Sequence, residues 1–351
     1  MALDEAPPFW WQDISWQAWL LSPISFVYGR AAGKRMDFAA SASVDVPVIC
    51  VGNFIVGGAG KTPTVELLSK FVRTRGMRPG ILTRGHGGAI TAATVVKRDH
   101  HNAHDVGDEA LLHAAHAITV VSADRPSGAA MLVKHGCDVI LMDDGFQNPS
   151  LEKDFSLVVV DAKRGLGNGF TMPSGPMRVP FRHQLLYADT VIVIGDGKRG
   201  DNVIRQCARA GKPILKAAIK AKGKLLPHTY FAYAGIADPS KFFDTLSSLG
   251  TDVKGTQAFG DHHFFRDEEC ADLMAQAKRM NARLLTTAKD AARLKGMGQA
   301  QEKLLEASDV LNVELQTEDA SLIENILDIA IENATQRRLK SKKRSRQKAT
   351  A

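Results

Sequence analysis

The stretch VGNFIVGGAGKTPT, residues 51–64, decides the fold of this chain. It connects an apolar run, VPVICVG, to a segment from Lys61 to about Arg75 with the pattern of a helix. Glycines in such a loop let backbone amides turn towards a phosphate, and the N-terminus of the following helix favours an anion. The stretch therefore predicts a phosphate-binding loop between a buried strand and a helix.

The residue types of the loop assign its parts. A lysine at the helix start reaches the β- and γ-phosphates of a nucleotide, and the hydroxyl that follows it ligates Mg²⁺. The usual pattern places a glycine five residues before Gly60, where this chain has Ile55. A tight glycine turn before a helix is the alternative, but the strand–loop–helix context favours nucleotide binding. We expect ATP and Mg²⁺ to bind at Gly57, Gly58, Ala59, Gly60, Lys61 and Thr62.

Short apolar runs rich in β-branched residues follow the loop, at 79–83, 118–122, 139–143, 157–161 and 190–195. Helical patterns lie between them, and strands that alternate with helices predict a doubly wound, mostly parallel sheet. A polar run, AIKAKGK (218–224), resembles a linker, and a second α/β set begins with TYFAYAG (229–235). The prediction is an α/β protein with a core domain at 41–220 and a smaller α/β domain at 221–335, followed by a tail at 336–351.

Two adjacent carboxylates end one of these runs, in MDDGFQ (142–147). Ligands of open parallel sheets bind at the carboxyl ends of the strands. An enzyme with a phosphate-binding loop needs an acidic residue there to hold Mg²⁺. Asp143 and Asp144 compete for this role. A capped turn after a strand is the structural alternative.

Other polar residues have two readings each. In VGDEALL (106–112), Asp108 or Glu109 is either a favourable charge at a helix N-terminus or a carboxylate beside an acceptor hydroxyl. His262 follows an aspartate in a loop, where a carboxylate tunes the proton affinity of histidine. Structural hydrogen bonding is the simpler interpretation of that loop. The residues alone do not choose between these roles.

The net charge of +7 is a property of the C-terminus. Of the 45 lysines and arginines, eight lie in RRLKSKKRSRQK (337–348), and the other 37 face 38 acidic residues. Such a tail is typical of a disordered, solvated end, so no nucleic-acid partner is expected, and attraction to anionic lipid headgroups or to RNA is the secondary alternative. The four cysteines form no C-x-x-C pair, which favours a reducing compartment over a disulfide framework or a zinc site.

Residues 1–40 are predicted to contain a membrane-associating helical segment. All four tryptophans lie between residues 9 and 20, and an aliphatic patch and basic residues follow them. This mixture suits a membrane interface, and a helix packed on the protein's own core is the alternative. No apolar stretch approaches the roughly 20 residues of a membrane span, and no signal-peptide pattern is present. We expect a protein of the cytoplasm or of the inner face of a membrane.

The motifs occur together in an order that resembles the tetraacyldisaccharide 4'-kinases of lipid A biosynthesis, from about residue 10 to residue 330. The similar segments are GNFIVGGAGKTP (52–63), LTRGHGG (82–88), VGDE (106–109), ADRP (123–126), DDGFQ (143–147), DAKRGLGNGFTMPSGPMR (161–178), FGDHHFF (259–265) and TTAKDAARL (286–294). The resemblance implies phosphorylation, by Mg-ATP, of the 4'-hydroxyl of a tetraacylated glucosamine disaccharide 1-phosphate. It implies a lipid disaccharide partner at the cytoplasmic face of the bacterial inner membrane. It also implies a smaller domain joined by a β-ribbon.

The resemblance also implies roles for single residues. Asp108 resembles the family's acceptor-activating aspartate, and His262 the histidine that pairs with it from the other domain. Asp144, with Asp143, resembles the magnesium carboxylate site. The remaining matches are Gln147, in the nucleotide or substrate cleft, and Arg125 and Arg178, near the phosphates or the lipid headgroup.

The chain departs from the family pattern at three positions. His86 stands for a tyrosine, Val179 for an acid, and Ala288 for an acid. None of these is a predicted nucleotide or magnesium ligand, so they affect the acceptor site and the interdomain contacts. A membrane-associated regulatory ATPase is the competing function, because the loop alone suits it equally well.

Overall fold

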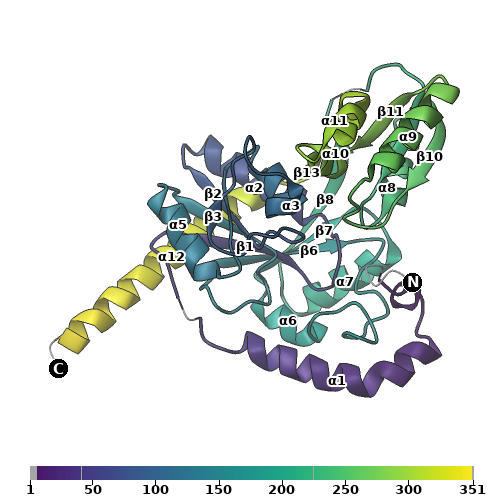
Figure 1. Cartoon of the computed structure of the whole chain (residues 1–351). Coiled ribbons are helices and arrows are strands. Elements are labelled where there is room, and N and C mark those ends of the chain that lie inside the picture. Colours follow the sequence, from purple (N-terminus) through teal and green to yellow (C-terminus); the bar gives the residue numbers. More distant parts are fainter. Residues whose placement is uncertain (1–5, 41, 224, 350–351) are drawn as a thin grey trace.

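The computed structural model describes residues 6–40, 42–223 and 225–349. It contains two β-sheets, each with its own helices, and the smaller unit is connected to one end of the larger one (Figure 1). Residues 1–5 of the predicted N-terminal segment, Lys224 of the predicted linker and the last two residues of the predicted tail lie outside the described part.

The larger sheet has nine strands in the order β13-β8-β7-β6-β1-β5-β2-β4-β3. Seven strands run parallel, while the edge strands β3 and β13 pair antiparallel with their neighbours. The predicted doubly wound, mostly parallel core is confirmed. The strands are β1 Val48–Asn53, β2 Pro79–Thr83, β3 Thr94–Val95, β4 Ile118–Val121, β5 Val139–Asp143, β6 Phe155–Asp161, β7 Thr190–Ile194, β8 Ile214–Ala221 and β13 Val313–Thr317.

Helices cover both faces of this sheet, which explains why its central strands are buried at every position and are mostly apolar. Successive residues of β1 enter different cores: Cys50 packs in the cluster that includes α5 (Arg125–Lys134), α6 (Phe181–Tyr187) and α7 (Lys198–Arg209). Val51 packs in the cluster beneath α2 (Lys61–Thr74) and α12 (Ala320–Ala349). Two short helices, α3 (Ala103–Val106) and α4 (Asp108–His113), precede β4.

The smaller sheet is entirely parallel, in the order β10-β9-β11-β12. Its strands are β9 Tyr230–Ala234, β10 Val253–Ala258, β11 Arg283–Thr287 and β12 Ser308–Leu311. Its helices are α8 Pro239–Ser248, α9 Asp267–Arg279, α10 Ala288–Leu294 and α11 Gln299–Glu306. The sheet has an apolar core on each face, so it forms a second α/β unit, as predicted.

An antiparallel ribbon connects the two units. The chain leaves the large sheet through β8 and returns through β13, with Ala221 opposite Val313. The ribbon that the resemblance implies is therefore present, but the predicted linker AIKAKGK is largely strand β8. The smaller unit ends near Leu311 rather than at residue 335, because β13 and α12 belong to the large sheet and its cover.

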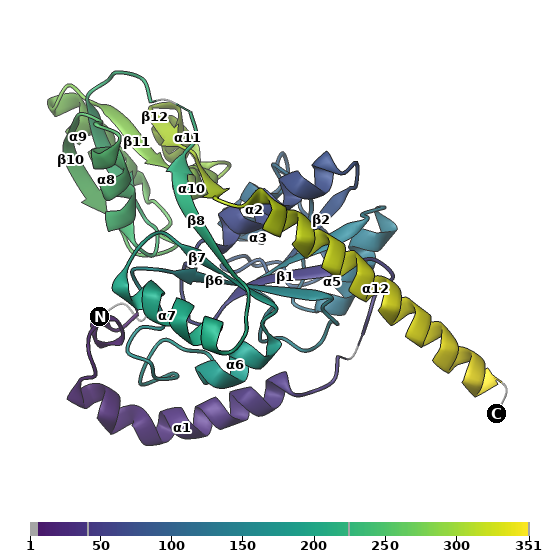
Figure 2. The same cartoon turned by 180° about the vertical axis from the view of Figure 1, so that it is seen from behind.

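The tail at 336–351 is predicted to be disordered, but the structure has a helix over most of it. Helix α12 continues to Ala349 without interruption. Its first part packs on the sheet, and Figure 2 shows its end projecting from the body.

Helix α1 (Trp16–Met36) lies beneath the core domain, after a short 3-10 helix, η1 (Pro8–Trp11) (Figure 1). Small residues, among them Gly29 and Gly33, face the protein and are buried. The hydroxyl of Ser25 donates to the carbonyl oxygen of Thr171 at 2.6 Å. The large apolar side chains face outward instead, and those exposed by 59–71% are Trp16, Trp19, Leu20, Ile24, Phe26 and Val27. A helix packed on the core accounts for only the small-residue face.

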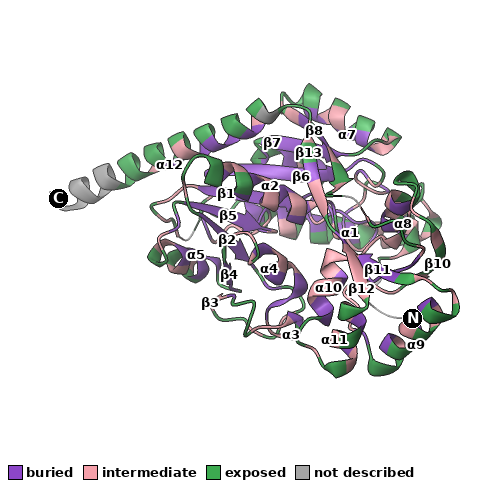
Figure 3. Cartoon of the chain, turned by 90° about the horizontal axis from the view of Figure 1, so that it is seen from above, coloured by how far each residue is buried: buried purple, intermediate pink, exposed green. Residues whose placement is uncertain are grey.

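No helix in the described part of the chain is long and apolar enough to cross a membrane. Figure 3 shows how burial concentrates in the central strands, while the outer helix surfaces stay exposed.

Candidate active site

The glycine-rich loop lies between β1 and α2 at the carboxyl edge of the large sheet. Gly57 and Gly60 have φ angles of 103° and 92°, which side chains with a Cβ rarely adopt. The Asn53 side chain donates to the carbonyl oxygen of Gly57 at 2.8 Å, and the Thr64 hydroxyl donates to that of Gly60 at 2.8 Å. These bonds fix the loop, so Lys61 and Thr62 begin α2 as predicted.

The two adjacent aspartates after β5 have different partners. The carboxylate of Asp144 accepts hydrogen bonds from both Nη groups of Arg178, at 3.0 and 2.9 Å. Lys61 Nζ lies 3.8 Å from Asp144 Oδ1. Burial would raise the pKa of Asp144, but the charges of Lys61 and Arg178 outweigh it and lower the pKa to about 2. The carboxylate therefore stays ionised and links the phosphate loop to Arg178.

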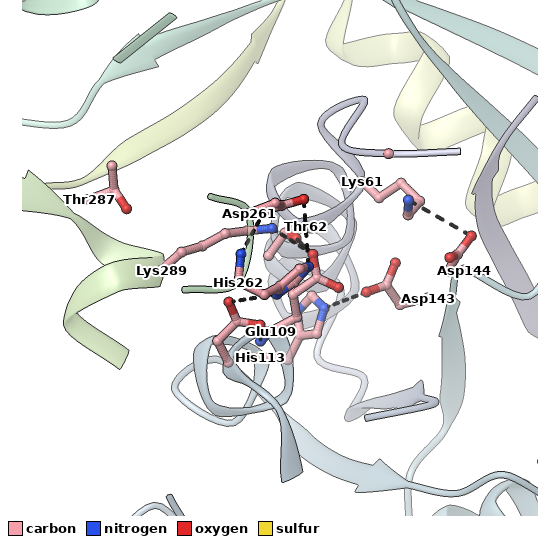
Figure 4. Close-up of polar contacts among 12 residues, drawn as sticks. Lys61, Thr62, Glu109, His113, Asp143, Asp144, Asp261, His262, Thr287 and Lys289 are labelled. Carbon is pink, nitrogen blue, oxygen red and sulfur yellow. Dashed lines mark hydrogen bonds and ion pairs between the residues drawn. The ribbon is translucent and has the colours of Figure 1, made fainter. Parts of the chain in front are cut away.

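Asp143 is fully buried and pairs with a histidine that the sequence reasoning did not single out. Its Oδ2 lies 2.9 Å from His113 Nε2, at the end of α4 (Figure 4). Burial opposes charge on His113, but the hydrogen bond and charge of Asp143 raise its pKa. The Oδ1 atom of Asp143 is buried and has no hydrogen-bond partner among the described residues. Mg²⁺ prefers oxygen ligands, carboxylate oxygens among them, so an unpartnered buried carboxylate oxygen fits this ion.

Asp108, at the start of α4, is 3% exposed and is held by the smaller domain. Arg293 Nε donates to its Oδ2 at 2.7 Å, and His262 Nδ1 lies 3.3 Å from the same oxygen. Burial raises the pKa of Asp108, but the hydrogen bond from His262 and the charge of Arg293 outweigh it, so the pKa lies below its ordinary value. The predicted pair of Asp108 and His262 is thus in contact in the structure.

The surroundings of His262 favour the charged form of its imidazole. The hydrogen bond to Asp108 raises its pKa, against the effect of burial. Its side chain is 30% exposed, compared with 2% for Asp108. The ring of His86, which stands for the family's tyrosine, lies edge-on to it with the centroids 5.3 Å apart. Asp144 and His262 are two of the three described non-glycine residues with positive φ, a strain that is common at functional sites.

Glu109 connects the phosphate loop to the smaller domain. Lys289 Nζ donates to its Oε1 at 2.6 Å, and the Thr62 hydroxyl donates to the same oxygen at 3.4 Å (Figure 4). The Lys289 charge lowers the pKa of Glu109 to about 2. Two neighbouring acids of α4 are therefore bound by two cations of α10, Lys289 and Arg293.

Arg125 and Gln147 occupy supporting positions. Arg125 is 3% exposed, and its Nη2 donates to the carbonyl oxygen of Asp143 at 3.2 Å. Gln147 donates to the carbonyl oxygen of Asn53 at 2.7 Å and accepts from Arg178 at 3.3 Å. Arg125 therefore holds the aspartate loop to the start of α5, and Gln147 holds it to the end of β1.

Three residues of the site were not predicted: His113, Lys289 and Arg293. Lys289 and Arg293 lie within TTAKDAARL, a segment that the resemblance includes without giving these residues a role. The only sequence feature that points to them is that two cations lie four residues apart in one helix. Their acidic partners could not be found in this way, because they lie about 180 positions away in the sequence.

The comparisons with known proteins point to one family. A model of the family LpxK, tetraacyldisaccharide-1-P 4'-kinase, matches residues 17–331. The tetraacyldisaccharide 4'-kinase of Rhizobium etli is 47% identical over 345 residues, which are 98% of this chain and 100% of the relative. That of Agrobacterium fabrum is 46% identical over 349 residues, 98% of this chain and 99% of the relative.

Among solved structures, the fold is similar to that of LpxK from Aquifex aeolicus, described as an "apo" form in complex with ATP. The TM-score is 0.70 at 24% identity, over 90% of this chain and 99% of that one. With the family match over most of its length and two close relatives aligned end to end, the chain belongs to the tetraacyldisaccharide-1-P 4'-kinase family.

Proposed function

We propose that this kinase transfers the γ-phosphoryl group of ATP to the 4'-hydroxyl of a tetraacylated glucosamine disaccharide 1-phosphate, with chemistry at the junction of its two domains. The observation that carries the proposal is the convergence of four features at one sheet edge: the phosphate loop, Asp143 at the end of β5, Asp144 after it, and the pair Asp108–His262. Family membership supplies the substrate class, since the matching family and relatives are named for it.

The nucleotide side uses Gly57 to Thr62. The amides of this loop and the ammonium of Lys61 would bind the phosphates, because oriented donors and a cation stabilise the charge that develops on the transferred group. The Thr62 hydroxyl and the unpartnered Asp143 Oδ1 would hold Mg²⁺, with His113 fixing the carboxylate from behind. When bound, Mg²⁺ neutralises phosphate charge and aligns the γ-phosphate.

Arg178 and Lys61 share Asp144, so a nucleotide phosphate entering beside Lys61 competes with that carboxylate. Arg178 could then remain with Asp144 or turn to a phosphate. Arg125 supports the aspartate loop through the Asp143 carbonyl group rather than by lying free in a cleft.

The acceptor side uses Asp108 and His262 as a coupled pair. As the acceptor oxygen bonds to the γ-phosphorus and the bond to the ADP oxygen breaks, the hydroxyl proton must leave. Asp108 takes it in this proposal, and His262 sets the orientation and proton affinity of the carboxylate. Since Asp108 is almost fully buried here, the acceptor reaches the pair only after the smaller domain shifts.

The membrane side is helix α1. Its outward apolar residues would enter the headgroup region, while Arg30, Lys34 and Arg35, all exposed, would contact lipid phosphates. Such a peripheral site at the cytoplasmic face of the inner membrane would give the enzyme access to an acceptor whose acyl chains lie in the bilayer.

Mass spectrometry of the lipid disaccharide after incubation with enzyme and Mg-ATP tests the function. Addition of one phosphate group at the 4' position is the expected product. ATP turnover that is equal with and without the acceptor, and no phosphorylated lipid, would instead support the regulatory ATPase.

A further inference from the structure

The last turns of α12 leave the protein body. The helix packs on the large sheet through apolar residues as far as Ala334. Arg337 anchors it to the body, with Nη2 2.8 Å from Asp154 Oδ2 and 3.2 Å from the carbonyl oxygen of Val46. Residues 338–341 are exposed, and the backbone continues as helix to Ala349. Figures 1 and 2 show this part projecting beyond the neighbouring elements.

The projecting part is strongly basic. The sequence has no acidic residue from position 333 onward. After Arg337 it contains seven lysines and arginines, namely Arg338, Lys340, Lys342, Lys343, Arg344, Arg346 and Lys348. Like charges one helical turn apart repel each other, and a short helix without packing is marginal in water. An anionic surface would remove this repulsion, and the rest of the chain carries almost no net charge.

The end of α12 lies on the side of the molecule where α1 lies. Figures 1 and 2 share a vertical axis, and in both α12 descends towards the level of α1, which forms the lower edge of the molecule. The apolar face of α1 points away from the protein, because its small residues face the core. A flat surface that meets this face therefore also approaches the end of α12.

We propose that residues 338–348 bind the anionic phospholipid headgroups of the bilayer on which α1 rests. The inference depends on the membrane association in the proposed function and extends it to a second, electrostatic contact. A single apolar anchor gives weak, reversible attachment, and a basic segment beside it strengthens binding to anionic membranes. A membrane explains both features, the basic end of α12 and the apolar face of α1 at the same level of the molecule. RNA binding would explain only the basic end.

The test is sedimentation of the full chain with phosphatidylcholine vesicles, with and without phosphatidylglycerol. The tail variant carries Lys340→Gln, Lys342→Gln, Lys343→Gln and Lys348→Gln. A matched control neutralises four exposed cations of the smaller domain, with Lys254→Gln, Lys278→Gln, Arg279→Gln and Lys303→Gln. The wild type and the control should bind phosphatidylglycerol vesicles more tightly than neutral ones. The tail variant should bind them at least about tenfold more weakly, yet keep its activity on detergent-dispersed acceptor.

The outcomes separate this inference from the proposed function. An unchanged preference of the tail variant for phosphatidylglycerol overturns the electrostatic contact and leaves the role of α1 intact. Tail-dependent binding to single-stranded RNA with unaltered vesicle binding overturns it in favour of the nucleic acid. If the wild type binds neither kind of vesicle, the membrane association itself is wrong and the inference falls with it.

Discussion

Arg293 of the smaller domain donates through Nε to Oδ2 of Asp108 in the core domain, across 2.7 Å and with both side chains almost completely buried. The same guanidinium also bonds Asp290 at 2.9 Å and the carbonyl oxygen of Gly235, so it is anchored in its own domain. The position of the smaller domain therefore determines the charge and orientation of the carboxylate.

Replacing Arg293 by glutamine should lower both stability and kcat. Removing one partner of a buried ion pair leaves an uncompensated charge, a change that typically costs about 3–5 kcal/mol. Arg293→Lys keeps the charge but loses the planar fork, so it should recover stability more than kcat. Urea unfolding and steady-state kinetics with a saturating lipid acceptor measure the two effects. Arg283→Gln, which removes an exposed ion pair with Asp309, is the control and should be nearly neutral.

The phosphate loop gives the plainest catalytic prediction. Lys61→Ala should reduce kcat by at least about 100-fold, because it removes a cation at the site of developing phosphate charge. It also frees Asp144 from one partner, while Arg178 still neutralises the carboxylate. Folding should therefore survive, and circular dichroism checks this. Activity within about threefold of the wild type would exclude the assigned role.

The apolar face of α1 predicts a change in partitioning. Trp19→Ser, Leu20→Ser, Phe26→Ser and Val27→Ser remove exposed apolar area without touching the buried small residues. Sedimentation with phosphatidylcholine vesicles should show weaker binding, at unchanged melting temperature. Serine at the exposed Ile219, Leu226 and Leu249, away from this face, serves as the control. Equal sedimentation of both sets would mean that the face is not a membrane contact.

Asp144 predicts how stability depends on pH. The pKa of Asp144 in the folded protein, about 2, lies below the ordinary pKa of an aspartate in the unfolded chain. Its contribution to the free energy of unfolding is therefore complete at pH values above that ordinary pKa, and it is lost as the pH falls towards 2. Arg178→Gln removes the bidentate partner and should reduce this contribution. Urea unfolding should therefore show a stability gap between the wild type and Arg178→Gln at pH 6 that narrows towards pH 3. A gap that is constant with pH would contradict the electrostatic account of this pair.

The predictable part of the fold is local. The loop from Gly57 to Thr62 follows from glycine conformation and helix-start chemistry, and buried strands such as β5 are continuous apolar runs. The sequence predicts a linker where the structure has the end of β8, because three lysines and a glycine interrupt the apolar residues of AIKAKGK, and Ile219 and Lys220 are exposed. The continuation of α12 was missed because a basic run gives no sign of helix by apolar periodicity.

The site was predictable where its residues lie in ordered motifs and not where contacts depend on tertiary placement. Asp143 and Asp144 follow from their place after a strand, but their separate partners, His113 and Arg178, depend on the packing of α4 and of the loop before α6. Arg293 resembles a surface helix residue in sequence. It becomes the largest fully buried side chain only because α10 packs on α4.

The pair Asp108–His262 makes the sharpest prediction about the chemistry. The two residues come from different domains and share the Oδ2 atom, so they should act as a unit. Asp108→Ala and His262→Ala should each lower kcat strongly, while ATP affinity stays nearly intact because neither residue contacts the phosphate loop in this structure. The double variant should be little worse than the poorer single one, since the losses of groups that act together are not additive.

The pH profile refines this prediction. The pKa of His262 is raised by its hydrogen bond to Asp108, so removing the carboxylate should return that pKa towards its ordinary value. NMR titration of His262 in Asp108→Asn should therefore show a midpoint at lower pH than in the wild type, even without substrate. His263, which pairs with Glu269 instead, is the internal control and should not shift. Fully additive losses in kcat with an unmoved His262 titration would exclude the coupled pair, and a large loss of ATP affinity in Asp108→Ala would make that residue part of the nucleotide site.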